Sequence, residues 1–159
     1  MPSHRVLVLM GSESDREILE KARPYYNYFS IEAELIVSSA HRNPQRTTEL
    51  ASQARAQGYE AIVCGAGMAA HLAGVCAAHS DLPVIGVPLK GGLMDGLDAL
   101  LATVQMPRGI PVATLAVGVA GAINSAVLCA RMFSLFDPEM RRRLEEFIHS
   151  GCTLPETQT

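Results

Sequence analysis

The feature of this sequence that most restricts its fold is a unit that repeats along 159 residues: a short apolar run, a turn, and a longer segment with apolar residues at helical spacing. The apolar runs predict strands at residues 6–10, 33–37, 61–64, 84–87 and 112–117. Strands that alternate with helices in this way form a parallel sheet with helices packed on both of its faces.

The segments between the predicted strands contain the usual signals of helix ends. In the predicted helix 44–57, a proline lies in the first turn and a glycine follows the last residue. Further helices are predicted at residues 18–29, 68–79, 93–104 and 121–136, and a final amphipathic helix begins at Asp137 and Pro138. Pro24 should kink or end the first helix, and we expect the aromatic residues just after it to pack the end of that helix or to form a subunit contact.

These patterns predict the α/β class, with a three-layer, flavodoxin-like, doubly wound sheet of five parallel strands and an added C-terminal helix. A barrel of eight strand–helix units would need about 250 residues, more than this chain has. In a doubly wound sheet the ligand binds beyond the carboxyl ends of the strands. The turns that follow the strands are therefore the place to look for a functional site.

Composition excludes several classes of protein. The formal charge is −3, eleven arginines stand beside only two lysines, and no basic run is longer than three residues, so we expect no nucleic-acid partner. No apolar run approaches the roughly 18 residues of a membrane span, and the first residues lack a signal peptide, so we expect a cytoplasmic protein without a membrane contact. The four cysteines show neither zinc-binding nor redox spacing, which predicts free thiols and no metal.

The first two turns contain polar side chains suited to a phosphorylated ligand. Residues 11–15 present two serine hydroxyls and backbone amides at a helix start, which suits an anion, while Asp15 suits sugar hydroxyls; an ordinary helix cap at Ser14 or Asp15 is the alternative. In the second turn, Arg42 beside Ser39 has the fork that binds two phosphate oxygens. His41 supplies an imidazole that can exchange a proton near neutral pH.

The third and fourth turns are rich in small residues. Residues 65–70 have almost no side chain, so the backbone can approach a flat ligand, although tight packing of the helix on the sheet explains the same residues. His71 is interpreted either as a pocket wall or as a helix-packing residue. The fourth turn, residues 90–92, is either a surface loop or a lid or pocket wall offered to a neighbouring subunit.

Four blocks of this sequence together resemble the N5-carboxyaminoimidazole ribonucleotide mutase family of purine biosynthesis. The blocks are residues 11–15 (GSESD), 39–44 (SAHRNP), 65–72 (GAGMAAHL) and 104–112 (VQMPRGIPV), which span most of the chain. The resemblance implies an isomerase that moves a carboxylate from the exocyclic nitrogen of aminoimidazole ribonucleotide to ring carbon 4, by loss and recapture of carbon dioxide, without ATP, cofactor or metal. Residues 1–152 would form a single flavodoxin-like catalytic domain, and residues 153–159 a flexible C-terminal tail.

The resemblance also implies roles for individual residues. His41 would be the acid and base, Ser12 and Asp15 would contact the substrate, and Arg42 with Ser14 and Ser39 would hold its phosphate. The remaining substrate-binding residues that it implies are Ala40, Gly67, Ala70, His71 and Leu72. It further implies a homo-octamer with active sites at subunit interfaces, and the predicted helix 121–130, apolar on most faces, independently favours association.

Two other functions remain open at this point. A related class, aminoimidazole ribonucleotide carboxylase, uses free carbon dioxide on the same scaffold but has a different third loop and usually lysine after the loop histidine, where this chain has Arg42. A non-catalytic flavodoxin-like module that binds a nucleotide is the other alternative. The chain departs from the usual mutase pattern at Arg16, Asn43, Met68, Ala73 and Gly91, which leaves His41, Arg42 and Asp15 in place.

Overall fold

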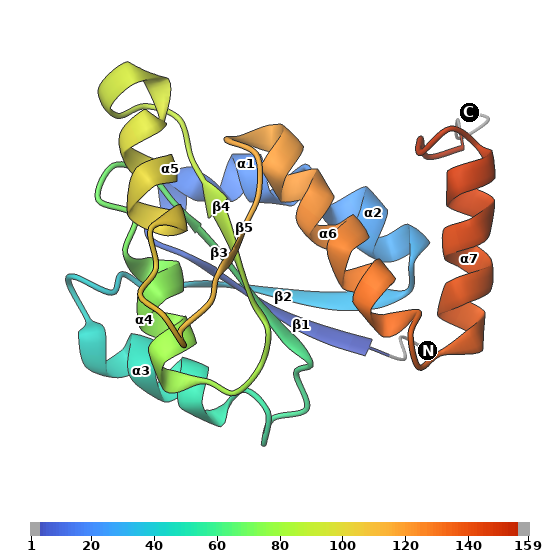
Figure 1. Cartoon of the computed structure of the whole chain (residues 1–159), viewed down its shortest axis with the longest axis horizontal. Coiled ribbons are helices and arrows are strands. Elements are labelled where there is room, and N and C mark those ends of the chain that lie inside the picture. The colour runs from blue at the N-terminus through green and yellow to red at the C-terminus, as the bar shows by residue number, and fades with distance from the viewer. Residues whose placement is uncertain (1–3, 156–159) are drawn as a thin grey trace.

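A computed structural model describes residues 4–155 and has the predicted α/β fold (Figure 1). Five parallel strands form one sheet in the order β2-β1-β3-β4-β5. Their bounds are β1 His4–Met10, β2 Ile31–Val37, β3 Ala61–Ala66, β4 Val84–Pro88 and β5 Ala113–Thr114. The first four agree with the sequence prediction to within a few residues, and the flavodoxin-like arrangement is confirmed.

The fifth strand is much shorter than the predicted strand 112–117. After Thr114 the chain still runs beside β4, because the amide of Leu115 donates to the carbonyl of Gly86 (2.9 Å). The next bond runs from the amide of Gly118 to the carbonyl of Pro88 (2.8 Å), and the residues between do not keep the spacing of a ladder. The apolar run therefore follows the edge of the sheet without remaining a regular strand.

Helices cover both faces of the sheet, and alternate residues of β1 point to opposite faces. The helices are α1 Arg16–Glu20, α2 Arg23–Tyr28, α3 Pro44–Gln53, α4 Leu72–His79, α5 Leu97–Val104, α6 Val119–Phe133 and α7 Pro138–His149. Val6 and Val8 belong to a core cluster with α1, α2, α6 and α7, whereas Leu7 and Leu9 belong to a second cluster with α3 and α4. Single-turn helices at Glu13–Asp15 (η1) and Leu93–Asp95 (η2) precede α1 and α5. None of the helices between residues 4 and 155 combines the length and the apolar character that crossing a membrane requires.

The structure confirms the break predicted at Pro24 and differs from the sequence prediction at two helix starts. Pro24 does divide the first helix, and it lies in the first turn of α2. The predicted helix 68–79 begins only at Leu72, because Met68 has a left-handed backbone (φ 53°). The predicted helix 93–104 likewise begins at Leu97, after Met94, Asp95 and Gly96, which all have positive φ. Apolar composition indicated helix at both places, but the backbone turns there instead.

The last helix, α7, is attached at the end of the sheet opposite the turns that follow β1 to β4 (Figure 1). Phe147 of α7 packs against the rings of Tyr25, Tyr28 and Phe29, with centroids 5.3–6.2 Å apart. The aromatic residues after Pro24 thus pack α7 within the chain. Leu154 also contacts the core cluster, and residues 156–159 of the expected flexible tail lie outside the described residues.

The start of α6 lies so close to the preceding backbone that only glycine fits. A Cβ atom added to Gly121 would lie 1.8 Å from the carbonyl oxygen of Ala116 and 3.1 Å from a methyl group of Val87. We expect Gly121→Ala to lower the free energy of unfolding by about 3 kcal/mol, because backbone rather than a flexible side chain must move. Chemical denaturation at fixed protomer concentration measures this effect. Asn124→Ala, an exposed change one turn further along α6, is the control, and equal stability of the two variants would contradict the close approach.

Candidate active site

The turns after β1, β2, β3 and β4 surround one cavity of about 750 Å³ at the carboxyl ends of the strands. The sequence-predicted site residues that line it are Ser12, Ser14, Asp15, Ser39, Ala40, His41, Arg42, Gly67, His71 and Leu72. Ala70 alone of the predicted set does not line the cavity. It is 1% exposed and lies beneath the loop, where its carbonyl accepts a hydrogen bond from Thr103 (3.5 Å).

The first turn is held by its own side chains. Ser12 caps η1: its amide donates to Asp15 Oδ2 (3.0 Å), and its hydroxyl accepts from the amide (3.4 Å) and the hydroxyl (3.0 Å) of Ser14. Capping and a place in the cavity are therefore both present, with Ser12 rather than Ser14 as the capping residue. Burial raises the pKa of Asp15, and the hydrogen bond from the Ser12 amide opposes that shift. One oxygen of Asp15 remains available to a ligand hydroxyl.

The second turn presents a guanidinium to the cavity. The amide of Arg42 donates to the Ser39 hydroxyl (3.2 Å), and Asn43 caps α3 by accepting from the amide of Arg46 (3.2 Å). Below the turn, the buried hydroxyls of Ser38 and Thr47 are joined at 2.8 Å. The exposed guanidinium of Arg42 has no acidic or carbonyl partner within residues 4–155. An always-charged fork without a protein partner is suited to binding an anion.

Two histidines from different turns meet in the cavity. His41 Nε2 lies 2.8 Å from His71 Nδ1, and the rings stand at 89° to one another with centroids 4.9 Å apart. They meet because β2 and β3 flank β1, so that the loops after these strands both reach across its end. His71 occupies the cap position of α4 and is exposed, so it forms a wall of the cavity rather than a helix-packing residue. In this contact one ring nitrogen donates and the other accepts, so the two rings have complementary tautomers.

The cavity also includes residues of the four turns that were not among the predicted site residues. Glu13 faces it but forms an ion pair with Arg16, which lowers the pKa of Glu13. Met68, 64% exposed, comes from the third turn, and Lys90 and Gly91 come from the fourth. The position of Lys90 just after a predicted strand was the sequence signal that could have identified it as a cavity residue. The fourth turn thus lines the cavity within this chain.

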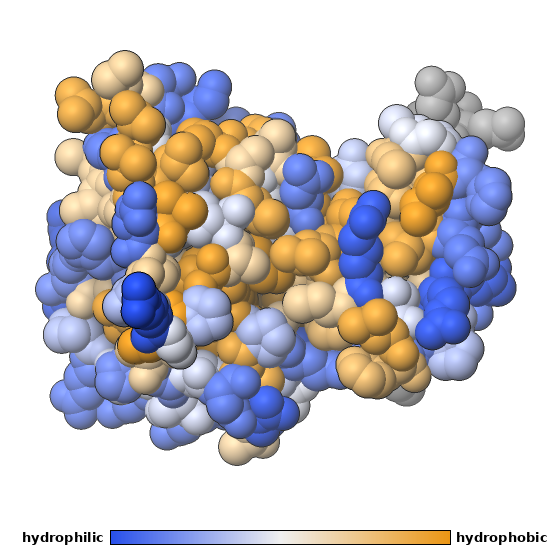
Figure 2. All heavy atoms as spheres, viewed as in Figure 1, coloured by the Kyte–Doolittle hydropathy of each residue, from blue (hydrophilic) through white to orange (hydrophobic). Residues whose placement is uncertain are grey.

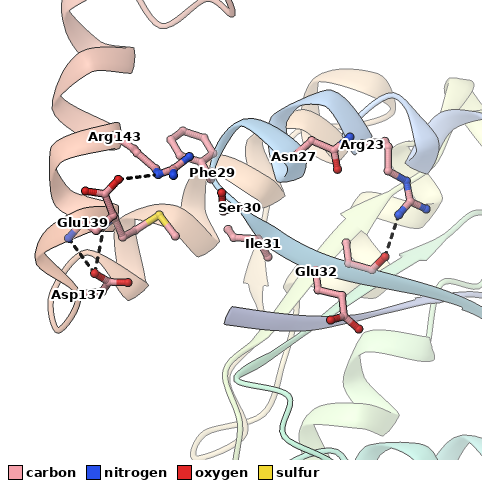
Figure 3. Close-up of a pocket in the computed structure, with 11 residues that line it drawn as sticks. Arg23, Asn27, Phe29, Ser30, Ile31, Glu32, Asp137, Glu139 and Arg143 are labelled. Atoms are coloured by element: carbon pink, nitrogen blue, oxygen red, sulfur yellow. Dashed lines mark hydrogen bonds and ion pairs between the residues drawn. The ribbon is translucent and has the colours of Figure 1, made fainter. Parts of the chain in front are cut away.

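A second hollow, of about 630 Å³, lies between α2, the edge strand β2 and the start of α7 (Figure 3). Its charged groups are engaged with one another or with backbone. Arg23 donates to the carbonyl of Ala33 (3.0 Å), and Arg143 donates to the carbonyl of Tyr28 (3.1 Å) and to Glu139 (3.1 Å). Asp137 accepts from the amide of Glu139 (2.8 Å). The Arg143 contact joins α7 to the end of α2 and the Arg23 contact joins α2 to β2, so these groups hold the elements together, and the cavity at the strand ends is the better candidate for chemistry.

The described part of the chain contains no group of three or more His, Cys, Asp or Glu side chains that could hold a metal ion. Its cysteines are free thiols: Cys64, Cys76 and Cys129 are buried, and Cys152 is exposed. Burial raises the pKa of Cys129 to about 12, so that this thiol stays protonated. None of the four lines the cavity. The reactive side chains of the cavity are therefore its histidines, its two carboxylates, its serines, Lys90 and Arg42.

Comparison with known proteins adds a family to this geometry. Residues 5–151 match the family model described as AIR carboxylase. The chain is 45% identical over 142 residues to the N5-carboxyaminoimidazole ribonucleotide mutase of Brucella melitensis, covering 89% of this chain and 88% of that protein. It is 48% identical over 143 residues to the mutase of Mycobacterium tuberculosis, covering 90% and 81%. Among solved structures, Treponema denticola PurE superposes with a TM-score of 0.84 at 27% identity, covering 93% of this chain and 91% of that one.

Proposed function

The chain belongs to the AIR carboxylase family, and we propose that it is an N5-carboxyaminoimidazole ribonucleotide mutase of purine biosynthesis, acting in the cytoplasm on a small ribonucleotide. The reaction moves a carboxylate from the exocyclic nitrogen to ring carbon 4 of the aminoimidazole, without ATP. The observation that supports it most strongly is that one cavity brings together His41, His71 and the unpartnered guanidinium of Arg42. This places a proton-exchanging group beside an anion-binding group.

The chemistry requires one group that first gives a proton and then takes one. The N-carboxylate is a carbamate, so when its carbon–nitrogen bond breaks, the bonding electron pair stays on nitrogen and a proton is needed there. The freed aminoimidazole has an enamine-like carbon 4, which attacks the released carbon dioxide. The hydrogen on carbon 4 must then leave as a proton to restore aromaticity. In this proposal His41 donates the first proton and removes the last, so that it ends in its starting state.

The enzyme's second task is to keep carbon dioxide beside carbon 4. Recombination inside a closed cavity behaves as a unimolecular step, so proximity replaces activation by ATP. The loop of residues 66–69 has small side chains apart from Met68, so its backbone can approach the flat ring. Leu72 lines the cavity beside this loop. His71 and Ala40 complete the wall around the base. Exclusion of water from this region would also help to keep the released carbon dioxide beside carbon 4 until it is captured.

The other half of the substrate is held by polar groups of the first two turns. Arg42 can bind two phosphate oxygens, with the hydroxyl of Ser39 in the same turn and that of Ser14 in the turn after the neighbouring strand β1. The free oxygen of Asp15 can accept from a ribose hydroxyl, with Ser12 beside it. The phosphate, sugar and base are thus each given a place in one cavity.

The reaction itself separates this function from its closest alternative. Purified protein should convert N5-carboxyaminoimidazole ribonucleotide to the carbon-4 carboxylate in buffer free of ATP and bicarbonate, followed by ultraviolet absorbance or chromatography of the product. If product forms only from the uncarboxylated ribonucleotide with added carbon dioxide, the protein is a carboxylase instead. If neither substrate reacts, the enzymatic proposal is wrong.

We also propose that the protein is a homo-octamer in which neighbouring subunits complete the cavity. Large apolar side chains gather over η2, α5 and the start of α6 on one face (Figure 2). Those with the greatest exposure there are Leu93 (71%), Met94 (76%) and Leu101 (49%). This patch continues from the fourth turn, so a subunit covering it would also border the cavity. Sedimentation should give eight chains of 17.0 kDa, about 136 kDa; a species at the mass of one chain would contradict association.

A further inference from the structure

Lys90 and Arg42 are the lysine and the arginine that line the cavity, and they belong to turns on opposite sides of it. Arg42 follows β2 and Lys90 follows β4, and the strand order places β1 and β3 between them. Neighbouring strands lie roughly 4.8 Å apart, so the axes of β2 and β4 are separated by about 14 Å. The two turns are therefore far enough apart for their cations to bind different anionic groups of one ligand.

The proposed substrate has two such anions. Its phosphate is attached to the ribose and its carboxylate to the imidazole, with the sugar and ring between them. Two separate cations fit two separate anions, and Ser39 and Ser14 follow the adjacent strands β2 and β1, at the Arg42 end of the strand order, where the phosphate is proposed to bind. The side of the cavity nearer Lys90 is then left for the base and its carboxylate.

The side chain of Lys90 is supported along its stem and loosely paired at its tip. Its Cγ, Cδ and Cε atoms lie 3.5–3.7 Å from the position that a Cβ on Gly118 would occupy, so the stem rests on that buried glycine. Its ammonium lies 3.7 Å from Asp95 Oδ2, which is longer than a hydrogen bond, and both side chains are mostly exposed. An exposed pair of this kind contributes little, and because neither Asp95 nor Gly118 lines the cavity, the ammonium turns from Asp95 toward the cavity to meet a substrate carboxylate.

The fourth turn gives this arrangement a defined backbone. Gly91 has φ +102° and borders the cavity, and a side chain there would be strained although nothing lies within 4 Å of its Cβ position. Asp95 itself has a left-handed backbone (φ 54°) just before Gly96. These turns bring the Asp95 carboxylate back toward the Lys90 ammonium.

We propose that Lys90 binds the carboxylate of substrate and product, and thereby distinguishes the carboxylated ribonucleotides from the uncarboxylated one. This inference rests on the mutase function proposed above. The ammonium attracts the carboxylate both on nitrogen and on carbon 4, but it has no comparable interaction with neutral carbon dioxide. Lys90 therefore affects the binding of substrate and product more than the chemical step, and its removal raises KM more than it lowers kcat.

The test compares two ligands that differ only in the carboxylate. Dissociation constants are measured by calorimetry for 4-carboxy-5-aminoimidazole ribonucleotide and for aminoimidazole ribonucleotide. For Lys90→Met we expect about tenfold weaker binding of the carboxylated ligand and less than about twofold change for the other, since a charged hydrogen bond is lost at a partly exposed site. Binding of the uncarboxylated ligand also shows that the variant is folded. The matched control is Lys21→Met, because Lys21 is the only other lysine and is exposed outside the cavity.

A second variant tests the partner of Lys90. Asp95→Asn removes the competing charge, and asparagine tolerates the left-handed backbone at this position. It should tighten binding of the carboxylated ligand and leave the other unchanged. Equal weakening of both ligands by Lys90→Met, or no weakening of either, overturns the role of Lys90 while the mutase function stands. If the unmodified protein binds neither ligand, the proposed function fails together with this inference.

Discussion

Replacing His41 with asparagine should lower kcat for carboxyl transfer by about a thousandfold, the largest effect expected of any side chain in the cavity. Asparagine is polar and smaller than histidine, so it fits the same place in the turn, but its amide ends near the position of Nδ1 and gives up the contact between His41 Nε2 and His71. It also cannot take up or release a proton, and both the nitrogen and carbon 4 need that exchange. Single-turnover kinetics with the N-carboxylated substrate measure the effect.

The control for this prediction is His79→Asn. His79 is exposed at the end of α4 and does not line the cavity, so its replacement should leave kcat within about twofold of the parental value. If His41→Asn keeps near-parental activity, His41 is not the proton donor. His71 is the next group in the cavity to test in that case, because its Nδ1 lies 2.8 Å from His41 Nε2.

The second large effect is expected at Arg42. Replacement by alanine should lower kcat/KM by about a hundredfold to a thousandfold, because two charge-assisted hydrogen bonds to phosphate would be lost. Its guanidinium has no protein partner among the described residues, so the loss should appear in substrate binding rather than in stability. Steady-state kinetics and a thermal melt separate the two effects.

Two further variants sharpen the test of Arg42. Arg42→Lys keeps the charge but not the planar fork, so it should recover only part of the lost kcat/KM. Arg46→Ala removes an exposed arginine in the first turn of α3 that does not line the cavity, and it should change kcat/KM little. If Arg42→Ala and Arg46→Ala reduce kcat/KM equally, general electrostatic attraction of the substrate accounts for the effect and Arg42 has no specific phosphate contact.

Much of the fold could be predicted because the buried strands have a simple physical signature. β1 packs apolar side chains on both faces of the sheet, so Val6–Met10 forms an uninterrupted apolar run. Pro24 likewise divides a helix, because proline cannot continue one. The fifth strand was harder to predict, since an edge segment can follow its neighbour with only a few regular bonds. Its apolar residues indicated burial, not ladder geometry.

The errors at the third and fourth turns have another cause. Met68 and Met94 belong to apolar segments that favour helix locally, yet both have left-handed backbones. Met68 itself lines the cavity, and Met94 follows Gly91, the last residue of the fourth turn that does so. Tertiary structure therefore overrides local preference in the turns that lead from a strand past the cavity to the next helix.

Individual site residues could be found from the sequence, but their contacts could not. His41 and His71 each follow a strand, and only the strand order brings their rings together. The support of Lys90 by Gly118 depends on two segments 28 residues apart, each beside β4. Ala70 shows the converse, because it belongs to a cavity-lining loop while its own side chain is buried beneath it. Position in a turn predicts proximity to the site but not the direction of the side chain.

The central claim, that carbon dioxide is released and recaptured without leaving the cavity, is tested most directly by an isotope experiment. The unmodified protein is given substrate with ¹³C in its N-carboxylate, in buffer with excess unlabelled bicarbonate, and the product is examined by mass spectrometry. Confinement predicts that most product molecules keep the ¹³C in the carboxylate on carbon 4. Product with the isotopic composition of the bicarbonate pool would contradict the claim and indicate an enzyme that uses free carbon dioxide.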